Sequence, residues 1–376
     1  MQIMGIHEQL GARKIINAEA TLTRLGGSLM PKEVLDAMLD AAQSWVDLPD
    51  FQRRISERIA QLTRNEACFI SSGAAAGLTL ATAVCVTGND PYLIQQLPNT
   101  DVPGMKNEVI VHRNQRIGYD YAVRQVGIKL IEIGNATATH PWELERAINE
   151  KTAAIIWFQG WMVRPGDLPL AHVIEVAKQH GVPVIVDAAA QLPPVENLWK
   201  FTEMGATVAI FSGGKDLRGP QSTGLMLGQK AFLDLIPMHA PPNPHMGRPM
   251  KVGKEEMAGA LAAVERYLKL DHEMRLANCE ETVADWNGML NTLPGVQATR
   301  GWPNEAGQPL PRSHVHLDPA RYHRDAVVKA MLAGDPPVTL AAGHENDVLL
   351  NPMTLEPGEE TIVLKRLVEV LRQFSK

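Results

Sequence analysis

The sequence has few cysteines and no long apolar run. Its three cysteines, Cys68, Cys85 and Cys279, are odd in number and widely spaced, so they offer neither a disulfide framework nor a paired-cysteine metal site. No apolar segment approaches the ~20 residues that a membrane span requires, and the first residues lack the apolar core of an export signal. We therefore expect a cytoplasmic protein with no membrane partner.

The sequence also lacks a block of like charge. Lysine and arginine together number 36, against 42 aspartate and glutamate residues, which gives a net charge of −6. Because no segment is basic enough to neutralise many phosphates, we expect a small-molecule substrate and no nucleic-acid partner.

The length of the chain predicts more than one domain. A single core stops growing at roughly 250 to 300 residues, and this chain has 376. We expect an N-terminal arm, a large domain and a small C-terminal domain, spanning residues 1–50, 51–245 and 246–376. In the arm, a helix opened by Pro31 has one apolar face, which we expect to pack in the core; the face is formed by Val34, Leu35, Met38, Leu39 and Ala42.

The middle of the chain alternates between short apolar runs and helical segments. Runs such as AAIIWF and VPVIVD are rich in valine and isoleucine and lack polar alternation, as strands covered on both faces do. The pattern predicts an α/β large domain with a mostly parallel sheet. Residues after about 250 combine helices with strands near HVHLD and DVLLNP, which predicts a smaller α+β domain.

Three predicted strand ends carry unusual residues, and in an open α/β sheet ligands bind beyond the carboxyl ends of the strands. One strand leads into the small-residue turn SSGAAAG, where a helix begins and backbone N–H groups suit a phosphate. The turn matches neither the dinucleotide nor the triphosphate fingerprint. A second strand ends in Asp187, and a third ends in the segment from Ser212 to Lys215.

Together these strand ends meet the needs of pyridoxal phosphate. This cofactor requires a cradle for its phosphate, a carboxylate that keeps its ring nitrogen protonated and a lysine amine for its aldehyde. We predict that Lys215 is the Schiff-base lysine and, once the substrate amine has displaced it, the general base at the α-carbon. Asp187 is predicted to pair with the ring nitrogen and Ser212 to bind the phosphate.

Several motifs resemble those of one enzyme family. They are INAEATLTRLGG, SSGAAAG, IVDAAA, FSGGKDLRGPQSTGLMLG and GRPMKVGKEEMAGALAAVERY. The chain is similar, from about residue 5 to 270, to the family that contains selenocysteine synthase (L-seryl-tRNA selenium transferase) and D-glucosaminate-6-phosphate ammonia-lyase. The resemblance implies fold type I, the aspartate-aminotransferase-like fold, with a smaller α+β C-terminal domain. It also implies a homodimer, or an assembly of dimers, with shared active sites.

The resemblance implies further site residues. The turn formed by Ser72, Gly73 and Ala74 would hold the cofactor phosphate, and His112 or the next residue, Arg113, would lie over the cofactor ring. Gln159 would approach the phenolic oxygen of the ring. Four basic residues are candidates for binding the substrate, the last as a fork for its carboxylate: Arg24, Arg248, Lys251 and Arg312.

The function that we predict is α,β-elimination, of the ammonia-lyase type, on a hydroxylated amino acid or amino sugar acid with or without a phosphoryl group. A racemase and a retro-aldol lyase use the same cofactor chemistry, so both stay open. Selenium transfer is not expected, because the tRNA-binding segment that precedes the INAEA motif in selenocysteine synthase has no counterpart here.

Three functions of other classes are alternatives. A nucleotide-dependent oxidoreductase would need a GxGxxG turn, which is absent, and a noncatalytic subunit would bind pyridoxal phosphate without turnover. A metal hydrolase is not expected, because His314 and His316 share a strand face without an HExxH motif or a carboxylate cluster.

Overall fold

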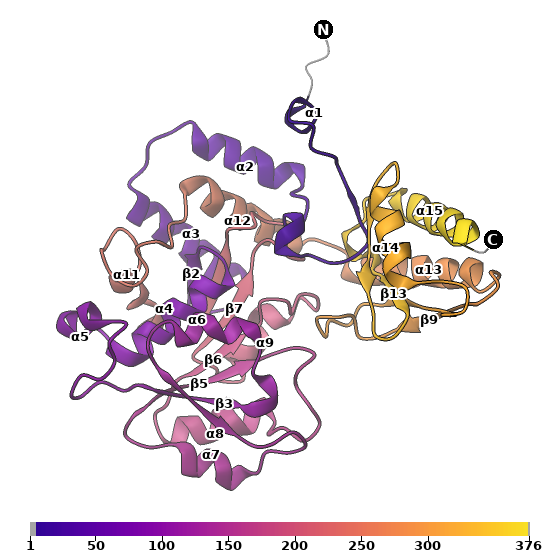
Figure 1. Cartoon of the computed structure of the whole chain (residues 1–376). Coiled ribbons are helices and arrows are strands. Elements are labelled where there is room, and N and C mark those ends of the chain that lie inside the picture. The colour runs from indigo at the N-terminus through magenta and orange to yellow at the C-terminus, as the bar shows by residue number, and fades with distance from the viewer. Residues whose placement is uncertain (1–4, 375–376) are drawn as a thin grey trace. The chain divides into compact units, whose positions relative to one another are not determined.

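The computed structural model describes residues 5–374 (Figure 1). They divide into two compact units, a larger one formed by residues 28–270 and a smaller one formed by the segments before and after it. This division differs from the expected boundaries at residues 50 and 245. Helix α2 (Lys32–Ala42) packs on α12 (Lys254–Tyr267) of the larger unit, whereas β1 (Ile16–Asn17) pairs with β11 (Val338–Thr339) of the smaller one.

A seven-stranded sheet forms the centre of the larger unit, in the order β2-β8-β7-β6-β5-β3-β4. Neighbouring strands from β7 to β4 run parallel, and β8 runs antiparallel to both of its neighbours. The predicted mostly parallel sheet is confirmed. The strands are β2 (Ala67–Ser71), β3 (Glu108–His112), β4 (Lys129–Ile133), β5 (Thr152–Phe158), β6 (Val184–Asp187), β7 (Val208–Ser212) and β8 (Gly224–Gly228).

Helices cover both faces of this sheet (Figure 1). Alternate strand residues point to opposite faces. Val111 and Ile156 pack with α4 (Ala74–Thr87), and we call this side the α4 face. Ile110 and Trp157 pack with α8 (Leu170–Gln179) on the other side, the α8 face. Because apolar contacts lie on both sides, the strands read as unbroken apolar runs.

The other helices of the larger unit are short, apart from α3. They are α3 (Leu48–Leu62), α5 (Pro91–Gln96), α6 (Tyr121–Arg124), α7 (Pro141–Ala147), α9 (Asn197–Glu203), α10 (Lys230–Leu233) and α11 (Ile236–His239), with the 3₁₀ turns η2 (Arg113–Gln115) and η3 (Gly118–Asp120). In α2, Leu35 and Leu39 are 48% and 62% exposed. The expectation that this face packs in the core is confirmed at Val34, which is buried where α2 contacts α12, and was wrong for Leu35 and Leu39.

The smaller unit is α+β, as predicted. Its antiparallel sheet has the order β12-β13-β10-β9, and buried residues such as Trp286, Val315 and Leu367 form its core. Its elements are α1 (Ile6–Gln9), η1 (Thr23–Leu25), α13 (His272–Leu290), β9 (Val296–Gly301), β10 (Arg312–Leu317), α14 (Arg324–Ala333), β12 (Ala341–Ala342), β13 (Asp347–Leu350), η4 (Pro352–Thr354) and α15 (Glu359–Phe374). Within residues 5–374, none of the helices has both the length and the hydropathy needed to cross a membrane.

Candidate active site

Strands β5, β6 and β7 end side by side and bring three of the predicted residues together. The backbone N–H of Gln159, just after β5, donates to the carbonyl of Asp187 over 2.9 Å. Ser212, at the end of β7, donates its backbone N–H to Ala189 over 3.3 Å. Asp187 and Ser212 both belong to the α4 face, since Asp187 is paired with Ile210 and Ser212 lies two residues beyond it.

The predicted phosphate cradle lies at the start of α4. Gly73 precedes the helix with a φ of +87°, a conformation that favours glycine. A side chain on Gly224 of β8 would lie 2.5 Å from the carbonyl carbon of Gly73 and 2.8 Å from the nitrogen of Ala74. The absence of that side chain therefore allows the turn to approach the sheet. The N–H groups of the first helical turn have no partner within the helix, so they can bind an anion.

The loop that carries Lys215 is a tight reversal between β7 and β8. Gly213 accepts a hydrogen bond from the N–H of Gly219 over 2.8 Å and donates its own N–H to Thr223, also over 2.8 Å. A side chain on either Gly213 or Gly214 would collide with the opposite arm of the loop. The glycines before the lysine are therefore required by the close approach of the two arms.

The residues beside Lys215 are anchored from outside the loop. Asp216 is buried and accepts a hydrogen bond from the hydroxyl of Tyr267, on α12, over 2.7 Å. On the other side, Ser28 donates its hydroxyl to the carbonyl of Gly214 over 3.1 Å. Sequence reasoning missed Asp216 and Tyr267 as positioning residues. Both lie within the family motifs, but only the fold shows that they touch.

Asp187 is a buried carboxylate, and burial raises its pKa. The N–H of Ala189, which donates to its Oδ1 over 3.0 Å, and the charge of Lys215 act in the opposite direction. Lys215 is thus near enough to act electrostatically on the acid. A cation beside Asp187 would favour its charged form. The predicted cofactor, with a protonated ring nitrogen, therefore fits these residues.

The geometry argues against the predicted position of His112 over the cofactor ring. His112 lies two residues after Ile110 on β3, so its side chain belongs to the α8 face, opposite Asp187. Its ring is fully buried and packs edge-on against Trp157, with 5.2 Å between the ring centroids. Neither ring nitrogen has a hydrogen-bond partner among the described residues, and burial lowers the pKa of His112.

Gln159 is positioned through both its backbone and its side chain. The indole N–H of Trp157 donates to Gln159 Oε1 over 2.7 Å, which leaves the amide nitrogen of Gln159 to donate. A phenolate oxygen of the cofactor accepts hydrogen bonds, so it would need a donor such as this amide nitrogen. Only the backbone of Gln159 contacts Asp187, whereas its side chain bonds to Trp157 of the α8 face, so its predicted role stays a prediction.

Two of the basic substrate candidates lie in the smaller unit. Arg24 is 61% exposed and forms an ion pair with Glu19. Arg312 has its Nη1 3.5 Å from Glu305, and burial raises the pKa of that glutamate. The Nε of Arg312 is buried without a hydrogen-bond partner among the described residues. The Nε–H group of Arg312 could therefore donate a hydrogen bond to a carboxylate.

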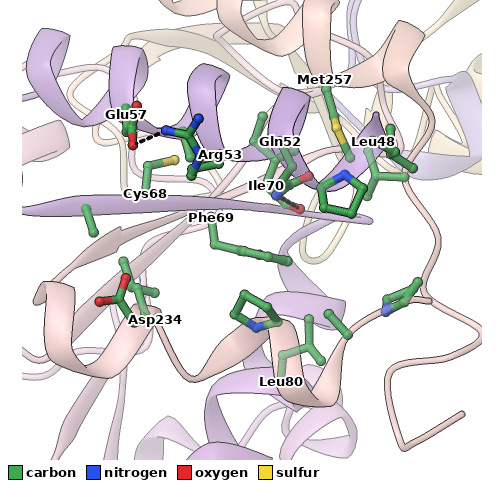
Figure 2. Close-up of a pocket in the computed structure, with 18 of the residues that line it drawn as sticks. Leu48, Gln52, Arg53, Glu57, Cys68, Phe69, Ile70, Leu80, Asp234 and Met257 are labelled. Atoms are coloured by element: carbon green, nitrogen blue, oxygen red, sulfur yellow. Dashed lines mark hydrogen bonds and ion pairs between the residues drawn. The ribbon is translucent and has the colours of Figure 1, made fainter. Parts of the chain in front are cut away.

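The other two candidates, Arg248 and Lys251, line a cavity of about 1000 Å³ that we call the edge cavity (Figure 2). It lies in the larger unit, along β2 at the edge of the sheet, and α3 contributes to its wall. None of the predicted cofactor residues lines it. The edge cavity is therefore distinct from the site at the ends of β5, β6 and β7, which we call the strand-end site. Arg248 and Lys251 are not part of the strand-end site within this chain.

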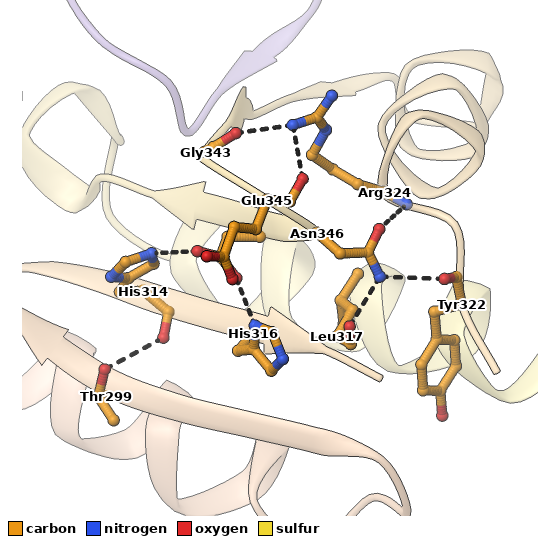
Figure 3. A network of polar contacts seen from close by, with 10 residues as sticks. Thr299, His314, His316, Leu317, Tyr322, Arg324, Gly343, Glu345 and Asn346 are labelled. Carbon is orange, nitrogen blue, oxygen red and sulfur yellow. Dashed lines mark hydrogen bonds and ion pairs between the residues drawn. The ribbon is translucent and has the colours of Figure 1, made fainter. Parts of the chain in front are cut away.

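The histidine pair on β10 has a carboxylate between its members. His314 Nε2 and His316 Nδ1 lie 2.8 and 2.7 Å from the two oxygens of Asp347, on β13 (Figure 3). The sequence did not indicate this acid, because Asp347 comes from a strand about 30 residues away along the chain. No group of three His, Cys, Asp or Glu side chains suited to a metal occurs within the described part of the chain.

Comparison with known proteins decides the family. The sequence profile of L-seryl-tRNA selenium transferase matches residues 15–280, more than half of the chain. The chain belongs to this family. It is 32% identical to the 5'-C-glycyluridine monooxygenase-decarboxylase of a Streptomyces species, over 97% of this chain and 92% of that one. It is 31% identical to the D-glucosaminate-6-phosphate ammonia lyase of Salmonella typhimurium, over 97% of both chains.

A solved structure extends the likeness to the whole fold. The structure of a D-glucosaminate-6-phosphate ammonia-lyase superimposes with a TM-score of 0.85 at 28% identity, over 100% of both chains. The predicted family resemblance and the predicted fold type I are confirmed.

Proposed function

We propose that this family member is a pyridoxal-phosphate-dependent lyase. It carries out α,β-elimination on a hydroxylated amino acid or amino sugar acid, with or without a phosphoryl group. The observation that carries the proposal is the meeting of Asp187 with Lys215 at adjacent strand ends, on the sheet face where α4 begins. The 31% identity to an ammonia lyase over nearly the whole chain supports this type of reaction.

The cofactor would be held by residues from three strand ends. Ser72, Gly73 and Ala74 would bind its phosphate, and Ser212 would reach the same group because it shares the α4 face. Lys215 would hold its aldehyde and Asp187 its ring nitrogen. When bound, the cofactor supplies a cationic ring that accepts the electron pair released at the substrate's α-carbon.

The chain's own residues then carry the proton transfers. Lys215 Nζ takes the α-proton, a role worth roughly 10²- to 10⁴-fold in rate. The hydrogen bond from Tyr267 to Asp216 limits the movement of the backbone next to this lysine. Asp187 keeps the ring nitrogen protonated, and its burial strengthens that pairing. Loss of the β-hydroxyl as water, followed by hydrolysis, yields a keto acid and ammonia.

The test is a panel of D- and L-hydroxy amino acids and amino sugar acids, including D-glucosaminate 6-phosphate, incubated in heavy water. Elimination predicts keto acid and ammonia in equal amounts from at least one compound, whereas exchange without keto acid indicates a racemase and release of an aldehyde indicates a retro-aldol lyase. The Lys215→Ala variant should lose the activity. If mass spectrometry of the borohydride-reduced native protein finds no pyridoxyl group on Lys215, the assignment fails.

One observation favours a second reaction. The chain is as similar to a monooxygenase-decarboxylase as it is to the ammonia lyase, at 32% and 31% identity over the same share of its length. We therefore keep oxygen-dependent decarboxylation of an amino acid as the second candidate. Anaerobic assays separate the two reactions, because elimination continues without oxygen whereas the oxygen-dependent decarboxylation stops.

We also propose a cytoplasmic homodimer, or an assembly of dimers, with shared active sites. The apolar side of α2 is exposed at Leu35 and Leu39, and the segment after it exposes Trp45 completely. Leu48, which follows, lines the edge cavity. A second copy of the chain would cover this apolar surface, and Arg248 and Lys251 beside it would then face the neighbouring subunit. The three free cysteines agree with a reducing compartment.

A further inference from the structure

The loop after β5 exposes a tryptophan and an arginine in contact with each other. Trp161 is 55% exposed, and the guanidinium of Arg164 lies 6.0 Å from the centre of its ring. An arginine near the face of a tryptophan is attracted by the π-electrons of the ring, and this contact limits the positions that the guanidinium adopts. The pair is therefore partly preorganised at the protein surface.

The backbone of this loop is held in place from several sides. Asp167 accepts the N–H of Arg164 over 2.9 Å and the side-chain amide of Asn114, in the turn after β3, over 2.7 Å. Met162 is buried, and a side chain on Gly166 would collide with the backbone of Thr137. The exposure of Trp161 and Arg164 is thus imposed by an anchored loop and is not the result of a loose one.

Arg164 differs from the other arginines near this edge of the sheet. Arg113 and Arg116 both form ion pairs with Glu132, and Arg124 forms one with Asp120. Within residues 5–374, no carboxylate lies within ion-pair distance of Arg164. Its guanidinium therefore forms no ion pair within the described residues and is available for an anion from solution.

The pair also lies close to the strand-end site. Trp161 is two residues beyond Gln159, so the α-carbons of Trp161 and Gln159 are at most about 7 Å apart. The N–H of Gln159 in turn donates to Asp187. We propose that Arg164, supported by Trp161, binds an oxyanion group at the distal end of the substrate, either a phosphoryl group or a second carboxylate. Arginine presents two parallel N–H donors that match such groups. This inference rests on the proposed function, because it takes the strand ends as the reaction site.

The test uses pairs of nonreactive compounds and the cofactor-loaded enzyme. Calorimetry compares 6-phosphogluconate with gluconate for the phosphoryl group and glutarate with butyrate for the carboxylate. In at least one pair, the wild type should bind the more charged member at least tenfold more tightly. Arg164→Gln should remove most of that preference, a loss of about tenfold to a hundredfold. Trp161→Leu should weaken it less, and thermal unfolding should show that both variants fold.

The control is Arg146→Gln. Arg146 is also exposed and lies on α7, which leads to the amino-terminal end of β5, away from the site. The proposal is wrong if the wild type shows no preference in either pair, if Arg164→Gln keeps the preference, or if Arg146→Gln loses it equally. With a turnover substrate, Arg164→Gln should raise KM and leave kcat nearly unchanged.

Failure of this inference can be distinguished from failure of the proposed function. The binding measurements need no turnover, so a preference that depends on Arg164 would stand even if no compound released keto acid. Conversely, release of keto acid together with an unchanged preference in Arg164→Gln would overturn only the role of Arg164.

Discussion

Substitution of Gly224 by alanine tests whether the turn before α4 is the phosphate cradle. Gly224 lies between Ser71 of β2 and Ser212 of β7. Its added methyl group would lie 2.5 Å from the carbonyl carbon of Gly73, about 0.9 Å closer than an ordinary contact of 3.4 Å. The neighbouring atoms are backbone, so the turn itself must move. Such overpacking costs about 1–3 kcal/mol of stability.

The displacement has a larger effect on the cofactor than on the fold. A shift of nearly 1 Å breaks or weakens at least one charge-assisted hydrogen bond to the phosphate, worth about 1.5–3 kcal/mol. The Kd for pyridoxal phosphate should therefore rise about 10- to 150-fold at 25 °C. Titration of the cofactor-free protein, followed by absorbance, measures this constant, and urea unfolding measures the stability separately.

Gly228→Ala is a matched control on the same strand and the same face. Its methyl group would collide with the backbone of Thr207 and lie 2.9 Å from the α-carbon of Val208, at the opposite end of β8. It should lower the stability of the fold by a similar amount and leave cofactor binding nearly unchanged. If Gly224→Ala binds the cofactor within twofold of the wild type, or if Gly228→Ala weakens binding equally, the turn is not the cradle.

Three further predictions concern single side chains. Asp187→Asn should keep the cofactor bound but slow α-proton exchange in heavy water by about a hundredfold or more, as loss of a preorganised charge does; a near-normal rate would remove the acid from the mechanism. Burial lowers the pKa of His112, so wild-type stability should fall as the pH drops below 6.5, where the unfolded chain binds a proton more readily. His112→Phe should lessen that fall, and identical pH profiles from urea unfolding would contradict the assignment. Trp45→Ser should shift the sedimentation coefficient from dimer towards monomer, and an unchanged value would exclude this surface from the interface.

Much of the candidate site could be predicted because its parts are local. The cradle, Asp187 and Lys215 each follow an apolar run, and parallel strands bring their carboxyl ends to one edge of a sheet. The orientation of His112 is of another kind. The sequence shows that this residue ends a strand, but the face to which it points depends on the register of β3 with its neighbours.

The sequence by itself determined the α/β class, the chain order of the site residues and the glycines at the tight turns, because these follow from short-range patterns of apolar residues and backbone conformation. Only the tertiary structure decided which remote residues meet. The contact of Tyr267 with Asp216, the carboxylate of Asp347 between His314 and His316, and the outward side of α2 all depend on residues that are distant in the chain. The apolar pattern of a helix shows that one side must be covered, but it does not identify what covers it, since burial is not directional.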